Sequence, residues 1–178
     1  MPASTRRLPL ALPAVVAASW LLAACSPPVP PRPAAPPGPS NAQMVASIRA
    51  AGDKEQSVIN VHPLADPGTA TLSDAARGDE QAGRYADAAA KLDQALKLAP
   101  GAPELLQERA EAAIYLGDYA TAERLARQSW SLGPKLGPLC VRNWQTVVEL
   151  RRRAGDAAGA ATARQQVAAC HEAGVPRY

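Results

Sequence analysis

Phenylalanine is absent from this 178-residue chain, and aromatic residues make up only 4% of it. A hydrophobic core without many large rings has to be built from alanine and branched aliphatic side chains, and alanine is frequent here. Small side chains let helix backbones approach closely, so this composition suits packed helices. About 140 residues follow the N-terminal apolar and proline-rich segments, which is enough for one domain.

Recognisable catalytic machinery is also missing. The chain has two histidines, His62 and His171, and each stands alone. Neither Cys140 nor Cys170 lies in a nucleophile motif with an orienting partner. No glycine-rich phosphate loop or metal-ligand spacing is present. We therefore expect a protein that is not an enzyme and that needs no cofactor or metal.

Charge of one sign is not in large excess. Nineteen lysines and arginines oppose 16 acidic residues, and without the N-terminal Arg6 and Arg7 the balance is 17 against 16. Nucleic-acid-binding domains normally carry a concentrated basic surface. The sequence thus argues against a nucleic-acid partner.

The N-terminus has the pattern of an export signal. Arg6 and Arg7 precede an apolar run at 8–22, which has signal-peptide length rather than membrane-spanning length. The run ends in Leu-Ala-Ala-Cys at 22–25, which resembles the lipobox of bacterial lipoproteins. This resemblance implies removal of residues 1–24 and attachment of lipid to Cys25.

Acyl chains on Cys25 would hold the protein on a membrane without spanning it. In lipoproteins of this type an aspartate after the cysteine favours the inner membrane, whereas this chain has Ser26. The expected location is therefore the outer membrane, facing the periplasm.

A proline-rich stretch at 27–39 follows the lipobox. Such a run samples polyproline II, a semi-rigid spacer of ~3 Å per residue. We expect residues 25–40 to form a lipidated linker with a disordered, proline-rich tether. Residues 41–68 should hold one short helix at 41–51, which could cap the domain, and an irregular segment at 53–68.

The strongest internal signal is a 34-residue period. Gly-Arg-Tyr-Ala-Asp-Ala at 83–88 recurs as Gly-Asp-Tyr-Ala-Thr-Ala at 117–122, and Pro100 recurs as Pro134. A more divergent copy at 155–160 follows after 38 residues. A fixed period of this length indicates an array of repeats, with an insertion before the last copy.

These motifs resemble the tetratricopeptide repeat (TPR), in which two antiparallel helices carry small residues where helices cross. The resemblance implies an all-α fold, a short right-handed α-solenoid of about three helix pairs. The domain would cover 69–174, with repeats at about 69–102, 103–136 and 141–174.

Individual helices follow from this register. Gly83, Gly117 and Gly155 should stop helices, and Asp118 and Asp156 should cap the helices that follow them. The expected helices of the array are 73–82, 85–98, 103–116, 119–132, 139–154 and 157–173.

In addition to Cys25 the chain has two cysteines, an even number in an oxidising compartment. In a helical hairpin the start of the first helix lies beside the end of the second, where Cys140 and Cys170 fall. We predict a disulfide that closes the last repeat. The alternative is a pair of reduced, buried cysteines.

In TPR proteins the first helix of each pair lines the concave face, which suggests a partner-binding surface here. A solvated charged face with no partner is the alternative. The residues predicted for partner binding are Arg77, Gln81, Gln107, Glu108, Glu111, Tyr115, Glu149 and Arg152.

The sequence thus favours a membrane-anchored adaptor or scaffold that binds a cell-envelope protein or peptide. Envelope assembly, secretion or pilus machinery and peptidoglycan enzymes are the processes considered. The alternative is a structural envelope lipoprotein that self-associates as a homo-oligomer without a defined client.

Overall fold

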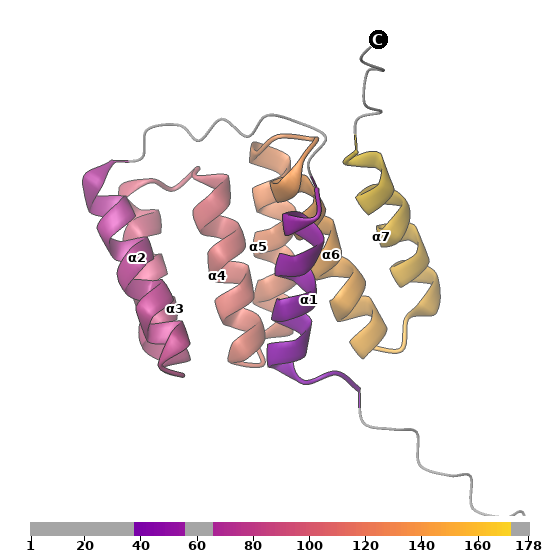
Figure 1. Ribbon diagram of the computed structural model, residues 1–178, viewed down its shortest axis with the longest axis horizontal. Coiled ribbons are helices and arrows are strands. Elements are labelled where there is room, and N and C mark those ends of the chain that lie inside the picture. The colour runs from indigo at the N-terminus through magenta and orange to yellow at the C-terminus, as the bar shows by residue number, and fades with distance from the viewer. Residues whose placement is uncertain (1–37, 56–65, 172–178) are drawn as a thin grey trace, which may run out of the picture. The chain divides into compact units, whose positions relative to one another are not determined.

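The computed structural model describes residues 38–55 and 66–171, and within these ranges it contains seven helices and no strand (Figure 1). None of the described helices is long and apolar enough to cross a membrane. The expected signal segment, Cys25 and most of the proline-rich linker lie outside the described residues. The prediction of an all-α solenoid is confirmed.

Six of the helices form three antiparallel pairs, and neighbouring pairs stack through α3 on α4 and α5 on α6 (Figure 1). The pairs are α2 (Pro67–Gln81) with α3 (Tyr85–Leu98), α4 (Pro103–Tyr115) with α5 (Tyr119–Leu132), and α6 (Pro138–Arg153) with α7 (Ala157–Ala169). We call the face formed by α2, α4 and α6 the inner face.

The turns within the pairs match the sequence prediction. Gly83, Gly117 and Gly155 have φ of 75°, 78° and 73°, a left-handed conformation that glycine adopts without a steric penalty. The carboxylates of Asp118 and Asp156 each accept a hydrogen bond from the backbone N–H three residues further on. Both predicted caps are therefore confirmed.

Alanines occupy the helix crossings, as the repeat register predicts. Ala76, Ala88, Ala95, Ala110 and Ala122 are at most 1% exposed. Because their side chains end at Cβ, neighbouring helices pack closely without large rings. The helix crossings of the core are therefore formed by small side chains along the whole array.

Two helix boundaries differ from the prediction. α2 begins at Pro67, six residues before the predicted start, so the interpretation of Pro67 and Gly68 as part of an irregular segment is wrong. The reason is local: the Asp66 carboxylate accepts hydrogen bonds from the N–H groups of Gly68 and Thr69, and proline fits the first turn of a helix. At the other end α7 stops at Ala169, and residues 56–65 and 172–178 lie outside the described residues.

The last pair is closed by a covalent link. Cys140, near the start of α6, and Cys170, at the end of α7, form a disulfide with their Cα atoms 5.6 Å apart. Both cysteines are buried, and Trp130 and Trp144 pack against them.

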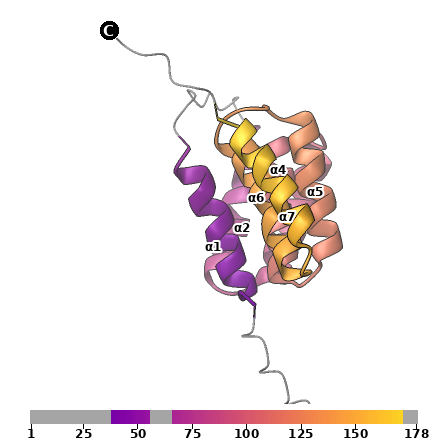
Figure 2. The same ribbon diagram turned by 90° about the vertical axis from the view of Figure 1, so that its right-hand side faces the viewer.

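The sequence suggested that α1 (Asn41–Asp53) could cap an end of the array, but the structure places it elsewhere. It packs on α6 and α4, across the inner face (Figure 2). Met44, Val45 and Ile48 are fully buried there, in one cluster with Ile114 and Leu150. This apolar stripe matches an apolar strip on the inner face, so the packing removes both from water.

Close approach of α1 to α6 depends on a glycine. A Cβ added at Gly52 would lie 2.6 Å from Cγ of Arg142 and 3.2 Å from the carbonyl oxygen of Pro138. Any larger residue at this position would therefore force Arg142 to move.

Candidate functional site

The polar side of α1 joins the inner face through Arg49. Its guanidinium donates to Glu80 of α2 and to Glu111 of α4, each at 2.7 Å. Burial alone would lower the pKa of Arg49, but the attraction of Glu111 and the hydrogen bonds to Glu80 and Glu111 raise it above its usual value. Arg49 is therefore charged at any accessible pH and links three helices.

Glu111 is the centre of this network, with a side chain that is 0% exposed. Arg142 of α6 donates to its Oε1 from Nε at 3.0 Å and from Nη2 at 2.6 Å. Gln107 donates to the same oxygen at 2.9 Å, and to Thr146 at 3.0 Å. A buried carboxylate is tolerated only with such compensation, and Glu111 has charged donors on two sides.

Polar contacts also hold both ends of α1. At its start, Tyr119 donates to the side-chain oxygen of Asn41 at 2.8 Å, and the Asn41 amide donates to the Tyr115 carbonyl at 3.4 Å. Just beyond its end, the buried Glu55 contacts Nδ1 of His171. The position of α1 on the inner face is therefore fixed along its whole length.

The residues predicted for partner binding fall into a buried group and an accessible group. Those that are buried, and that a partner therefore cannot contact, are Gln107, Glu111 and Glu149. Those that are exposed or half-buried are Arg77, Gln81, Glu108, Tyr115 and Arg152.

Glu149, which is buried, and Tyr115, which is half-buried, make contacts within the domain. Glu149 accepts a hydrogen bond from Ser47 of α1 at 2.9 Å. Tyr115 stacks on Tyr85 with ring centroids 4.2 Å apart, and burial raises the pKa of its hydroxyl. Both residues therefore contribute to the packing of the inner face.

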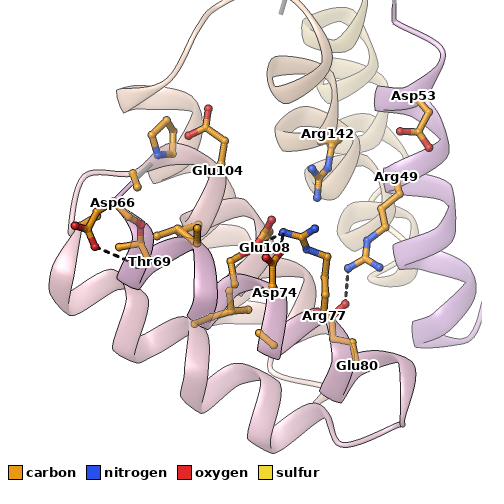
Figure 3. Close-up of a pocket in the computed structure, with 18 residues that line it drawn as sticks. Arg49, Asp53, Asp66, Thr69, Asp74, Arg77, Glu80, Glu104, Glu108 and Arg142 are labelled. Atoms are coloured by element: carbon orange, nitrogen blue, oxygen red, sulfur yellow. Dashed lines mark hydrogen bonds and ion pairs between the residues drawn. The ribbon is translucent and has the colours of Figure 1, made fainter. Parts of the chain in front are cut away.

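α1 leaves part of the inner face open. A pocket of about 810 Å³, which we call the inner pocket, lies between α1, α2, α4 and α6 (Figure 3). Its apolar lining includes Ala76, Leu92, Ala102 and Leu105. Its charged lining consists of Arg49, Asp53, Asp66, Asp74, Arg77, Glu80, Glu104, Glu108 and Arg142.

Arg77 and Glu108 are the predicted partner-binding residues that line the inner pocket (Figure 3). Ser73 donates to the Glu108 carboxylate at 2.6 Å, and Arg77 donates to Ser73 at 3.2 Å while pairing with Asp74 at 3.0 Å. Burial raises the pKa of Glu108, and this effect outweighs the hydrogen bond from Ser73 and the attraction of Arg77 and Arg142, which lower it.

The contribution of α1 and of Glu104 to this site was not predicted from the sequence. The apolar stripe of Met44, Val45 and Ile48 was the available signal, since a short amphipathic helix needs a surface to cover. Within residues 38–55 and 66–171, no group of three or more His, Cys, Asp or Glu side chains is arranged to hold a metal ion.

Comparison with known proteins identifies the family of the repeats. The sequence profile of the tetratricopeptide repeat matches residues 80–135. The solved structure of the globular C-terminal domain of LpoP from P. aeruginosa matches with 32% identity and a TM-score of 0.55, over 58% of this chain and 97% of the LpoP domain. The chain belongs to the tetratricopeptide-repeat family. No curated protein sequence matches it.

The sequence-based recognition of a TPR bacterial lipoprotein is confirmed. The inner face of this chain corresponds to the surface that TPR solenoids form from the first helix of each pair. Solenoids of this kind bind partners along such extended surfaces. The inner pocket is the part of this surface that α1 leaves accessible.

Proposed function

We propose that this chain is a membrane-anchored TPR adaptor lipoprotein that binds other cell-envelope proteins in the periplasm. The observation that carries the proposal is the inner pocket, a charged and open hollow on the face that TPR proteins use for binding. The lipobox at 22–25 and the similarity to LpoP support an envelope location, with lipid on Cys25 and the outer membrane as the proposed address.

The mechanism of such an adaptor is local concentration. A lipid on Cys25 confines the TPR domain to one membrane, and the proline-rich linker gives it reach. A client held in the inner pocket is then kept near that membrane and near any second client. No bond has to be made or broken, so the proposal needs no catalytic residue.

A second candidate is a structural lipoprotein that self-associates. Leu98 and Leu132, at the ends of α3 and α5, are 61% and 54% exposed and could contact a second copy. Sedimentation of the purified full chain in detergent distinguishes the two functions. A mass that stays monomeric over a range of concentrations contradicts self-association, whereas a concentration-dependent mass supports it.

In-cell photo-crosslinking tests the adaptor function. A photoreactive residue replaces Ala70, which lines the inner pocket, and in a second strain it replaces Ala90, which is exposed on the outer helix α3. We expect an envelope protein to be captured from position 70 and not from position 90. Capture of nothing from position 70, or of the same proteins from both positions, would contradict the proposal.

A further inference from the structure

We propose that the inner pocket binds a peptide segment of the client that carries lysine or arginine side chains beside apolar ones. The inference rests on the proposed function and specifies the chemistry of the partner. It follows from the charge of the pocket, from the way α1 binds the same face, and from the apolar lining.

The pocket has an excess of negative charge. Three arginines and six carboxylates line it, which gives a net charge of −3. Two of the arginines, Arg49 and Arg142, already donate to Glu111 beneath them. Among the described residues no lysine or arginine forms an ion pair with Glu104 or Glu108, so these two carboxylates are available to a cation.

α1 shows how the inner face binds a helix. It presents an apolar stripe, Met44, Val45 and Ile48, and one cation, Arg49, which pairs with Glu80 and Glu111. The inner pocket continues this interface, since Arg49 and Glu80 also line it. A client with the same combination of apolar and cationic side chains therefore fits the free part of the face.

Glu108 has no lysine or arginine paired with it among the described residues, and a cation from the client would supply one. Its carboxylate is half-buried, accepts a hydrogen bond from Ser73 and has a pKa raised by burial. Arg77 pairs with Asp74 and donates to Ser73, and Arg77 and Arg142 attract Glu108 without forming an ion pair with it. A lysine or arginine from the client would stabilise the ionised form of Glu108 by direct attraction.

The size and lining of the pocket favour a peptide side chain of this type. A volume of about 810 Å³ is in the range that holds several side chains. Ala99, Ala102 and Pro103, which are half-buried, offer an apolar surface for the methylene stem of lysine or arginine and for a neighbouring aliphatic residue. The charged end then reaches Glu104 and Glu108.

The test uses a short fluorescent peptide of lysine, leucine and alanine, with a matched peptide that has glutamate at every lysine position. Fluorescence anisotropy measures binding of each peptide to the purified full chain. We expect the lysine peptide to bind, with an affinity that falls as salt is added. The glutamate peptide should bind at least about tenfold more weakly, which corresponds to ~1.4 kcal/mol.

Variants locate the binding site. The double substitution E104Q/E108Q should weaken the lysine peptide about tenfold, ~1.4 kcal/mol. Asp87→Asn is the matched control, because it removes an exposed carboxylate from the outer helix α3, and it should leave the affinity unchanged. Arg77→Gln removes a cation from the pocket and should strengthen binding.

Three results would overturn the inference: no binding of the lysine peptide, equal binding of both peptides, or an unchanged affinity in E104Q/E108Q. These results are independent of the proposed function, which fails if no client is captured from position 70 in cells or if positions 70 and 90 capture the same proteins. A client captured there whose bound segment is acidic would keep the adaptor function and reject the cationic partner.

Discussion

The guanidinium of Arg49 donates to the carboxylate of Glu111 at 2.7 Å, across 62 residues of sequence. This bond connects the helix that precedes the repeats to the middle of the array. It also removes Glu111 from the set of residues that a partner could reach. The accessible part of the inner face is therefore defined by α1 as much as by the repeats.

Arg49→Gln tests the link between α1 and the array. Glu111 would keep Arg142 but lose its second cation, and Arg49 is 36% exposed, so the cost should fall below that of a fully buried pair, at about 1–2 kcal/mol. Urea denaturation of the purified full chain measures it. Arg124→Gln, on the exposed side of α5, is the control and should change the free energy of unfolding very little. Equal effects of the two substitutions would mean that the Arg49 contacts do not stabilise the domain.

Ile48→Ala tests the apolar packing of α1. Ile48 is fully buried between α1 and the inner face, so truncation should cost about 2–5 kcal/mol. Ile48→Val, which removes a single methylene, should cost about 0.5–1.5 kcal/mol. Thermal unfolding followed by circular dichroism checks the order of the three proteins. A melting temperature that is the same in all three would show that α1 is not docked.

Glu108→Gln should stabilise the domain at neutral pH. Burial raises the pKa of Glu108, so the folded state binds this proton more tightly than the unfolded state, and the ionised carboxylate destabilises the fold. This cost is present above the folded pKa and disappears as the pH falls below the unfolded pKa.

Denaturation midpoints at pH 7 and below about pH 4 check this prediction. The variant should be more stable than the wild type at pH 7, and the difference should shrink in acid. A variant that is less stable at pH 7 would contradict the account of Glu108 as a carboxylate without adequate compensation.

Replacement of both Cys140 and Cys170 by serine should destabilise the last repeat. The bond joins residues 30 apart, and the loop-closure argument gives about 3–4 kcal/mol for a ring of this size. The wild type should run faster on a non-reducing gel than after reduction and should lose thermal stability when reduced. The serine variant should respond to neither treatment. A wild type that is insensitive to reductant would favour the reduced, buried pair.

The local signals in this sequence predicted most of the fold. The bounds of α3 and α5, Tyr85–Leu98 and Tyr119–Leu132, agree with the prediction because glycine stops precede both helices and the 34-residue period repeats them. The start of α2 was missed because Pro67 and Gly68 read as a break, although Asp66 in front of them is a helix cap. Residues close in the sequence, the glycine stops and the Asp66 cap, set each of these helix bounds.

The accessible part of the inner face was harder to predict from the sequence. The repeat pattern placed Gln107, Glu111 and Glu149 on the inner face, but it contains no information on a helix outside the repeats. Whether α1 caps an end or covers a face depends on long-range packing of Met44 and Ile48. Glu111 and Glu149 bond directly to α1, through Arg49 and Ser47, whereas the partners of Gln107 are Glu111 and Thr146 on α4 and α6.

The central claim is that the inner pocket binds an envelope client through its carboxylates. The most direct test is the yield of client adducts from a photoreactive residue at position 70, measured in cells by mass spectrometry, in the wild-type background and in E104K/E108K. The account predicts that charge reversal abolishes most of the adduct while the protein level stays the same. An equal yield in both backgrounds would contradict it.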